Sequence, residues 1–134
     1  MAFGKRFLAA GKIRHQHERG RMNKPEQEFA ALCQLSPDWL RESLGIIVYT
    51  CRFEAVRYQL ANGVTLLPDF ELIATETGQI VVVEVKVKAK NGRVLWEDDA
   101  RVKIKVLAHE YPERRVVVAI REHTGLWTFE EIDP

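Results

Sequence analysis

The alternation of apolar and polar residues predicts one strand that is buried on both faces. The run Ile80–Val87 is apolar at every position except Glu84 and Lys86. Because successive side chains of a strand point to opposite faces, these two charges share one face with Val82, while the other face is entirely valine. A strand this apolar is typical of the centre of a sheet, where two charged side chains need a specific reason.

A helix is predicted near the start of the chain, over residues 24–35. Asn23, with a proline in the first turn after it, is typical of a helix start. Glu26 falls on the inward face of this helix together with Phe29, an unusual position for a carboxylate. A short turn or helix is expected to follow over residues 37–44.

The segment between this helix and the apolar run has the composition of short strands and turns. Strands are expected at residues 46–49, 53–60 and 64–74. Asn62 and Gly63, between the last two, form the strongest hairpin signal in the chain. Pro68 cannot donate to a strand ladder and therefore marks a bend, bulge or edge. Residues 77–78 then turn the chain into the apolar run.

A second helix is expected after the apolar run. The three acids at residues 97–99 suit a helix N-terminus, and a helix from there to about Tyr111 places Ile104 and Leu107 on one face. Two more strands are expected at residues 116–120 and 126–132. The order is therefore helix, three or more strands, helix and strands, which predicts an α/β fold with a mixed central sheet flanked by helices.

Length and composition fit one folded domain. The chain has 134 residues, of which 46% are hydrophobic, enough for one core. No apolar stretch approaches the roughly 20 residues that span a bilayer, and no secretory signal is evident. We therefore expect a cytoplasmic protein without a membrane partner. Cys33 and Cys51 have no metal-ligand spacing around them and predict reduced, buried thiols.

Positive charge is concentrated at the N-terminus. Residues 1–24 contain seven Lys or Arg and one acid, although the formal net charge of the chain is only +1. Residues 1–22 have few large apolar side chains and predict a mobile basic arm, followed by a single domain at residues 23–134. Such an arm could contact phosphate or pack against a partner, and the sequence leaves both open.

The turn at residues 77–78 predicts which residue faces Glu84. If the strands pair symmetrically about it, paired positions add to 153 or 154, and Asp69 lies opposite Glu84 or Val85. Two such carboxylates about 4 Å apart would repel by roughly 4 kcal/mol at an effective dielectric of about 20. A divalent cation of the Mg²⁺ type would cancel that repulsion. Lys86 is then placed to orient or activate a water, or to balance phosphate charge.

A simpler arrangement is compatible with the same spacing. Lys86 could neutralise Glu84 or Asp69 in a cross-strand salt bridge on a solvated sheet face. Glu54 is a further candidate acid, although a solvent-facing position is more typical of such a residue. The three tryptophans show no regular stacking array and are expected to pack in the core or at its rim.

Two pairs of sequence blocks carry a resemblance to a known family. LPDF at residues 67–70 and VEVK at residues 83–86 follow a helix with an inward Glu26. Together these segments resemble the PD-(D/E)xK motif of the restriction-endonuclease-like nucleases. Two further segments, MNKPE at residues 22–26 and EDDARVKIK at residues 97–105, are similar to one branch of this superfamily that is encoded by phages and prophages. The match covers roughly residues 22–121 and leaves the basic arm unmatched.

The resemblance implies a restriction-endonuclease-like core and Mg²⁺- or Mn²⁺-dependent hydrolysis of DNA, as an endonuclease acting on branched or phage DNA in a bacterial host cytoplasm. It implies metal ligation by Asp69, Glu84, the Val85 carbonyl and Glu26. Lys86 is implied to be catalytic, together with the carboxylates of Asp69, Glu84 and Glu26. The rival function is a catalytically silent DNA-binding or regulatory module that keeps the same fold.

Basic residues near the acids favour DNA as the partner. They lie in the loop after the apolar run and on the second helix: Lys88, Lys90, Arg93, Arg101, Lys103 and Lys105. Phosphate contact is their functional interpretation, and a solvated amphipathic helix is the alternative. One small domain carries one site, so cutting both strands of DNA would be easiest for a two-fold homodimer.

Overall fold

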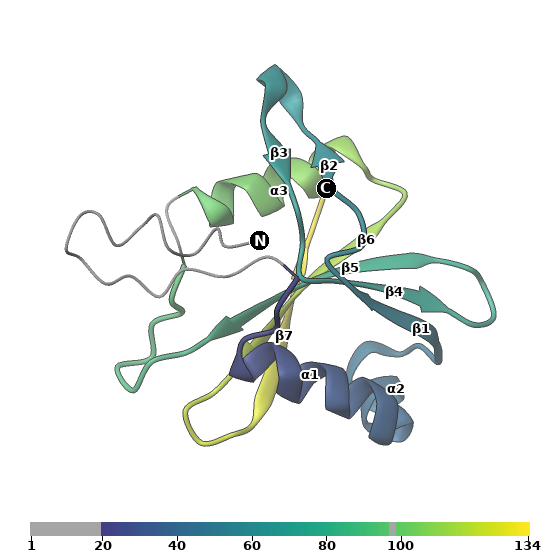
Figure 1. Ribbon diagram of the computed structural model, residues 1–134, viewed down its shortest axis with the longest axis vertical. Helices are drawn as coiled ribbons and strands as arrows, with labels where there is room; N and C mark the ends of the chain where they lie inside the picture. Colours follow the sequence, from purple (N-terminus) through teal and green to yellow (C-terminus); the bar gives the residue numbers. More distant parts are fainter. Residues whose placement is uncertain (1–19, 97–98) are drawn as a thin grey trace.

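The computed structural model describes residues 20–96 and 99–134, which form an α/β domain (Figure 1). Its helices are α1 (Lys24–Leu35), α2 (Pro37–Leu44) and α3 (Ala100–Glu110). Its strands are β1 (Val48–Phe53), β2 (Tyr58–Gln59), β3 (Thr65–Leu66), β4 (Phe70–Ala74), β5 (Ile80–Val87), β6 (Arg115–Arg121) and β7 (Trp127–Ile132), with a short 3₁₀ turn, η2, at Ala61–Gly63. Most of the arm predicted at residues 1–22 lies outside the described residues.

The main sheet has five strands in the order β1-β4-β5-β6-β7. β5 and β6 are parallel and are connected through α3, whereas the other neighbours pair antiparallel. β5 therefore occupies the centre of the sheet, which confirms the prediction made from its apolar run. The short pair of β2 and β3 forms a separate two-stranded sheet.

Helices cover both faces of the main sheet. Figure 1 shows α1 and α2 on one side, with α3 and the β2–β3 hairpin on the other. Val81 and Val83 of β5 pack with Phe29 on the α1 side, whereas Val82 packs with Ile104 on the α3 side. This division follows from the alternation of side chains along a strand. In the described residues no helix is long and apolar enough to cross a membrane.

The start of α1 is fixed by a reciprocal cap. The backbone N–H of Glu26 donates to Asn23 Oδ1 at 3.0 Å, and the backbone N–H of Asn23 donates to Glu26 Oε1 at 2.9 Å. This capping box satisfies two N–H groups that would otherwise lack helical partners. The helix start predicted at Asn23 is therefore confirmed, and the cap also holds the Glu26 carboxyl in place.

The turn signals between β2 and β5 are confirmed. Asn62 and Gly63, at φ of 60° and 75°, turn the chain between β2 and β3. The strand predicted over residues 64–74 is broken around Pro68, so that β3 belongs to the small sheet and β4 to the main sheet. Asp69 is the last residue before the chain enters the main sheet.

The bounds of the strands predicted at residues 46–49 and 53–60 are wrong. The first strand, β1, continues to Phe53 because no turn-forming residue interrupts it and β4 pairs with it through a bulge between Val48 and Thr50. Only the short β2 lies within the rest of the second predicted strand. β1 ends at Glu54, whose φ of 47° bends the backbone out of the strand. The second helix begins at Ala100 after Asp99, and residues 97–98 lie outside the described residues.

Candidate functional site

The β4–β5 register brings Asp69 and Glu84 together. Pairs such as Phe70 with Val83 occupy positions whose numbers add to 153, as predicted from the turn. Continuing the ladder by one residue sets Asp69 opposite Glu84. The Asp69 backbone N–H donates to Glu84 Oε1 at 3.1 Å, and the Val85 N–H donates to Asp69 Oδ2 at 2.8 Å. The two carboxylates are thus held by backbone groups of each other's strands.

Glu26 from α1 completes a group of three buried carboxyls. Glu26, Asp69 and Glu84 expose only 3%, 8% and 7% of their surface. The carboxyl of Glu26 hydrogen-bonds that of Asp69. The inward position predicted for Glu26 is confirmed, because the first turn of α1 lies over the point where β4 begins.

The carboxyls bind protons unusually tightly. Burial, reinforced by the negative charge of Asp69, raises the pKa of Glu26 to about 8. Burial, again with the charge of Asp69 adding to it, raises the pKa of Glu84 to about 8, although Lys86 acts in the opposite direction. Negative charge at this position is therefore unfavourable unless a cation accompanies it.

Lys86 lies between an acid and an aromatic ring. Its Nζ is 3.8 Å from Glu84 Oε2 and 5.2 Å from the centre of the Trp96 ring. The salt bridge anticipated as the simpler interpretation is thus present, but the pKa of Glu84 remains raised despite it. Lys86 alone does not offset the negative charge of the cluster.

Trp96 is a neighbour that the sequence did not reveal. The ring lies 5.3 Å from the Arg101 guanidinium as well as beside Lys86, so two cations face one indole. Arg101 is held in turn by two hydrogen bonds to Glu130, of 2.9 and 3.3 Å. Trp96 comes from the irregular segment before α3, where no periodicity indicates which way a side chain points.

Glu54 also lies close to the cluster. Its backbone N–H donates to the Asp69 carbonyl at 2.8 Å, and its charge raises the pKa of Glu26. Its carboxyl accepts a 2.7 Å hydrogen bond from the Gly20 N–H. Sequence reasoning favoured a solvent-facing position for Glu54, and the signal that would have corrected it is the end of β1 at this residue.

The Val85 carbonyl points toward the side of β5 on which Asp69 lies. In a strand, the N–H and C=O of one residue point to the same side. Because the Val85 N–H donates to Asp69, its carbonyl oxygen also faces the side on which β4 begins. The backbone oxygen and the Asp69 carboxylate are therefore on the same side of β5.

A hard divalent cation fits this donor set. In the described residues, no group of three or more His, Cys, Asp or Glu side chains has the spacing of a ready-made metal site. Mg²⁺, however, is usually held by one or two carboxylates with several retained waters. Asp69 and Glu84, buried together with raised proton affinity, supply two carboxylates of that kind.

Glu71 is a fourth buried acid, and its partners are a tyrosine and, through that tyrosine, an arginine. It is 6% exposed and accepts a hydrogen bond from the Tyr58 hydroxyl. Arg114 Nε donates to that hydroxyl at 2.9 Å, and its guanidinium stacks over the Tyr58 ring. Burial raises the pKa of Tyr58. This network ties the β2–β3 hairpin to the main sheet without any need for a metal.

The predicted phosphate contacts divide into two groups. Lys88 pairs with Glu122 at 3.1 Å, and Arg101 pairs with Glu130. Within residues 20–96 and 99–134, no ion pair engages the remaining four: Lys90, Arg93, Lys103 and Lys105. These four are the cations with charge available for a partner.

Comparison with known proteins adds little to this site. No family model and no curated protein matches the chain. Among solved structures the chain is similar to SSO0001, with 12% identity and a TM-score of 0.41 over 79% of this chain and 50% of that one. The chain thus spans half the length of SSO0001, and a likeness of this strength carries no argument about fold or function.

Proposed function

We propose that this protein is a Mg²⁺- or Mn²⁺-dependent nuclease with a restriction-endonuclease-like core, which hydrolyses phosphodiester bonds of DNA. The observation that carries the proposal is the meeting of Asp69, Glu84 and Lys86 where β4 and β5 separate. A salt bridge accounts for Glu84 and Lys86 alone, whereas a metal-assisted hydrolytic site would use Asp69 and Glu84 as ligands with Lys86 beside them.

Asp69, Glu84 and the Val85 carbonyl are the groups that would hold the cation. Bound there, Mg²⁺ supplies positive charge that acidifies water and offsets charge on the attacked phosphate. Glu26 hydrogen-bonds Asp69 and so fixes the direction of that carboxylate. The raised proton affinity of Glu84 means that a cation and protons would compete for its carboxyl oxygens.

Lys86 supplies a second positive charge beside the proposed cation. Its ammonium lies beside Glu84 and can donate to a phosphate oxygen or to the water that attacks in line. Contact with the Trp96 ring restricts where that ammonium can go. Lys86 therefore contributes to the rate of hydrolysis, whereas Asp69 and Glu84 contribute to metal binding.

DNA is the partner that the surrounding charge suits. Lys90 and Arg93 lie in the loop after β5, and Lys103 and Lys105 lie on α3. Arg101, at the start of α3, contacts the Trp96 ring that also faces Lys86. The contacts of the first four cations would be to phosphate and independent of base sequence. Each chain carries one such site, so a two-fold homodimer would cut both strands of a duplex or a branched junction.

The test is a cleavage assay on DNA of different shapes. Supercoiled, linear, single-stranded, flap and four-way-junction DNA are incubated with the full chain in Mn²⁺, and in parallel with a chelator. The proposal expects at least one shape to be cut, only when the metal is present. DNA binding without cleavage of any shape would indicate the silent module instead.

A further inference from the structure

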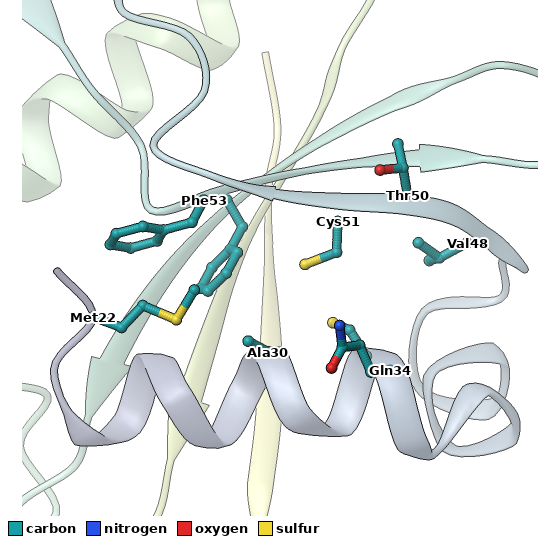
Figure 2. Close-up of a pocket in the computed structure, with 9 residues that line it drawn as sticks. Met22, Ala30, Gln34, Val48, Thr50, Cys51 and Phe53 are labelled. Carbon is teal, nitrogen blue, oxygen red and sulfur yellow. The ribbon is translucent and has the colours of Figure 1, made fainter. Parts of the chain in front are cut away.

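The two cysteines of the chain meet in a pocket between α1 and β1. The pocket has a volume of about 510 Å³, and its lining includes Cys33 from α1 and Cys51 from β1. Figure 2 shows the Cys51 sulfur pointing from the strand toward the helix. Both side chains are only partly buried, which differs from the buried thiols expected from the sequence. A small reagent can therefore reach both thiols.

The thiols interact with each other. A hydrogen bond between the two side chains lowers the pKa of Cys51 and raises that of Cys33. Cys33 is thus the donor, and Cys51 is the sulfur that ionises first. A thiol with a lowered pKa is the more reactive nucleophile of a pair. The other thiol lies beside it, in the position of a resolving cysteine.

The pair joins the elements that carry two of the acids. On α1, Cys33 comes seven residues after Glu26, about 10 Å along the helix. On β1, Cys51 comes three residues before Glu54, about 10 Å along the strand. Glu26 and Glu54 therefore lie about 10 Å from the thiols along α1 and along the β1 chain. A link at the thiols fixes the spacing of α1 and β1.

We propose that Cys33 and Cys51 form a redox modification site, a reversible dithiol–disulfide pair that ties α1 to β1. The oxidant is a low-molecular-weight disulfide such as glutathione disulfide. The Cys51 thiolate attacks one of its sulfurs, which forms a mixed disulfide and releases one glutathione thiolate. Cys33 then loses its proton and displaces the second glutathione, closing the bond between the two cysteines. Two protein thiols are oxidised, and one disulfide is reduced to two thiols.

This inference does not rest on the nuclease proposal, because the pocket lies on the α1–β1 side and needs neither metal nor DNA. Thiols close enough to share a hydrogen bond need to approach by only about 2 Å to reach the length of a disulfide. The pocket of about 510 Å³ beside the thiols leaves space for that movement, while both cysteines also pack against the core cluster that contains Phe29.

The test uses the full chain, reduced and folded, incubated with glutathione disulfide and then blocked with iodoacetamide. Trypsin should release residues 22–41 and 42–52 joined by a disulfide, since it cuts after Arg41 and Arg52 but not before a proline. The intact mass should fall by two hydrogens relative to the reduced chain, and dithiothreitol should reverse the change. In Cys33→Ser the Cys51 thiol should keep its glutathione, whereas Cys51→Ser should take up glutathione more slowly.

Stable glutathione adducts on the wild-type chain would overturn the inference, because they would show that Cys33 does not resolve the mixed disulfide. Disulfides between two chains would overturn it as well. So would thiols that remain unmodified in the folded chain while reacting fully after denaturation. Circular dichroism of each sample keeps misfolding of a variant apart from these outcomes, and the wild-type result alone decides the proposal.

Discussion

Asp69 and Glu84 hold each other across the end of the β4–β5 ladder. The backbone N–H of Asp69 donates to the carboxyl of Glu84 at 3.1 Å, and the residue after Glu84 donates its N–H to the carboxyl of Asp69 at 2.8 Å. Two like charges are thus positioned by rigid backbone groups rather than by flexible side chains. Such preorganisation is what a metal site needs before the metal arrives.

Removing either carboxylate should weaken metal binding. Asp69→Asn and Glu84→Gln keep the size of the side chain but remove a charged oxygen ligand, so calorimetry should show Mn²⁺ affinity falling by more than about tenfold. Glu76→Gln is the matched control, because Glu76 is exposed in the turn between β4 and β5. Equal Mn²⁺ binding by Asp69→Asn and the wild type would rule out this pair as the ligands.

Loss of Lys86 should separate metal binding from reaction. Lys86→Met should bind Mn²⁺ as the wild type does and cut DNA about 100-fold more slowly, since a positioned proton donor typically contributes that much. The readout is the single-turnover rate at saturating DNA. Lys90→Met, which removes a charge from the exposed loop, should weaken DNA binding without changing that rate. A Lys86→Met rate equal to wild type would contradict the assigned role.

The metal-free protein should become less stable as the pH rises. The folded pKa values of Glu26 and Glu84 are about 8, against an ordinary value of 4.5, so both carboxyls bind protons more tightly when folded. Their contribution to stability is complete below about pH 4.5 and is lost as the pH rises to about 8. Thermal midpoints measured in chelator should fall across this window.

Saturating Mg²⁺ should reverse that loss. Its effect on the thermal midpoint should be larger at about pH 8 than at about pH 5, because protons and Mg²⁺ compete for the carboxyls. Glu26→Gln, which cannot ionise, should flatten the pH dependence of the metal-free protein. A thermal midpoint that rises with pH in chelator would show that burial does not raise the pKa values of these carboxyls.

Trp96 should act through Lys86. Trp96→Phe keeps an aromatic face for the ammonium, whereas Trp96→Leu removes it, so the leucine variant should lose about tenfold in rate and the phenylalanine variant less. The loss should appear in kcat rather than in KM. Leu95→Ala is the control, because Leu95 is 58% exposed in the same segment. Equal rates for Trp96→Leu and Leu95→Ala would exclude a positioning role.

Salt dependence should distinguish the paired cations from the others. Replacing both Lys103 and Lys105 with Gln should reduce the slope of log affinity for DNA against log salt by about 2, near 0.9 for each phosphate that is no longer neutralised. Lys88→Gln should change the slope less, because Lys88 already pairs with Glu122. The measurement is DNA affinity by anisotropy over a salt series. A larger effect from Lys88 would contradict this division.

The parts of the site that the sequence could predict depend on local periodicity. The turn at Gly78 fixes the β4–β5 register, and alternation along the strand then places Asp69 against Glu84. The 3.6-residue period of α1 turns Glu26 inward. Each of these rests on geometry that extends only a few residues along the chain, which explains why the predictions are confirmed.

The parts that the sequence could not predict depend on packing between distant elements. Trp96 reaches Lys86 from an irregular segment, where no periodicity indicates the direction of a side chain. Cys33 and Cys51 meet only because α1 lies against β1, and neither residue's neighbours along the chain indicate that contact. Glu54 was misjudged because the end of β1 was placed wrongly, and one error in a strand boundary changes the predicted side-chain direction.

The central claim is that the Asp69–Glu84–Lys86 cluster hydrolyses DNA with a divalent cation. Its most direct test measures cleavage of the DNA panel in Mn²⁺ by wild type, Asp69→Asn and Lys86→Met, purified identically. We predict that wild type cuts at least one shape, that chelator stops it, and that both variants are at least about 100-fold slower on that shape. Cleavage of no shape by wild type, or equal cleavage by the variants, would contradict it.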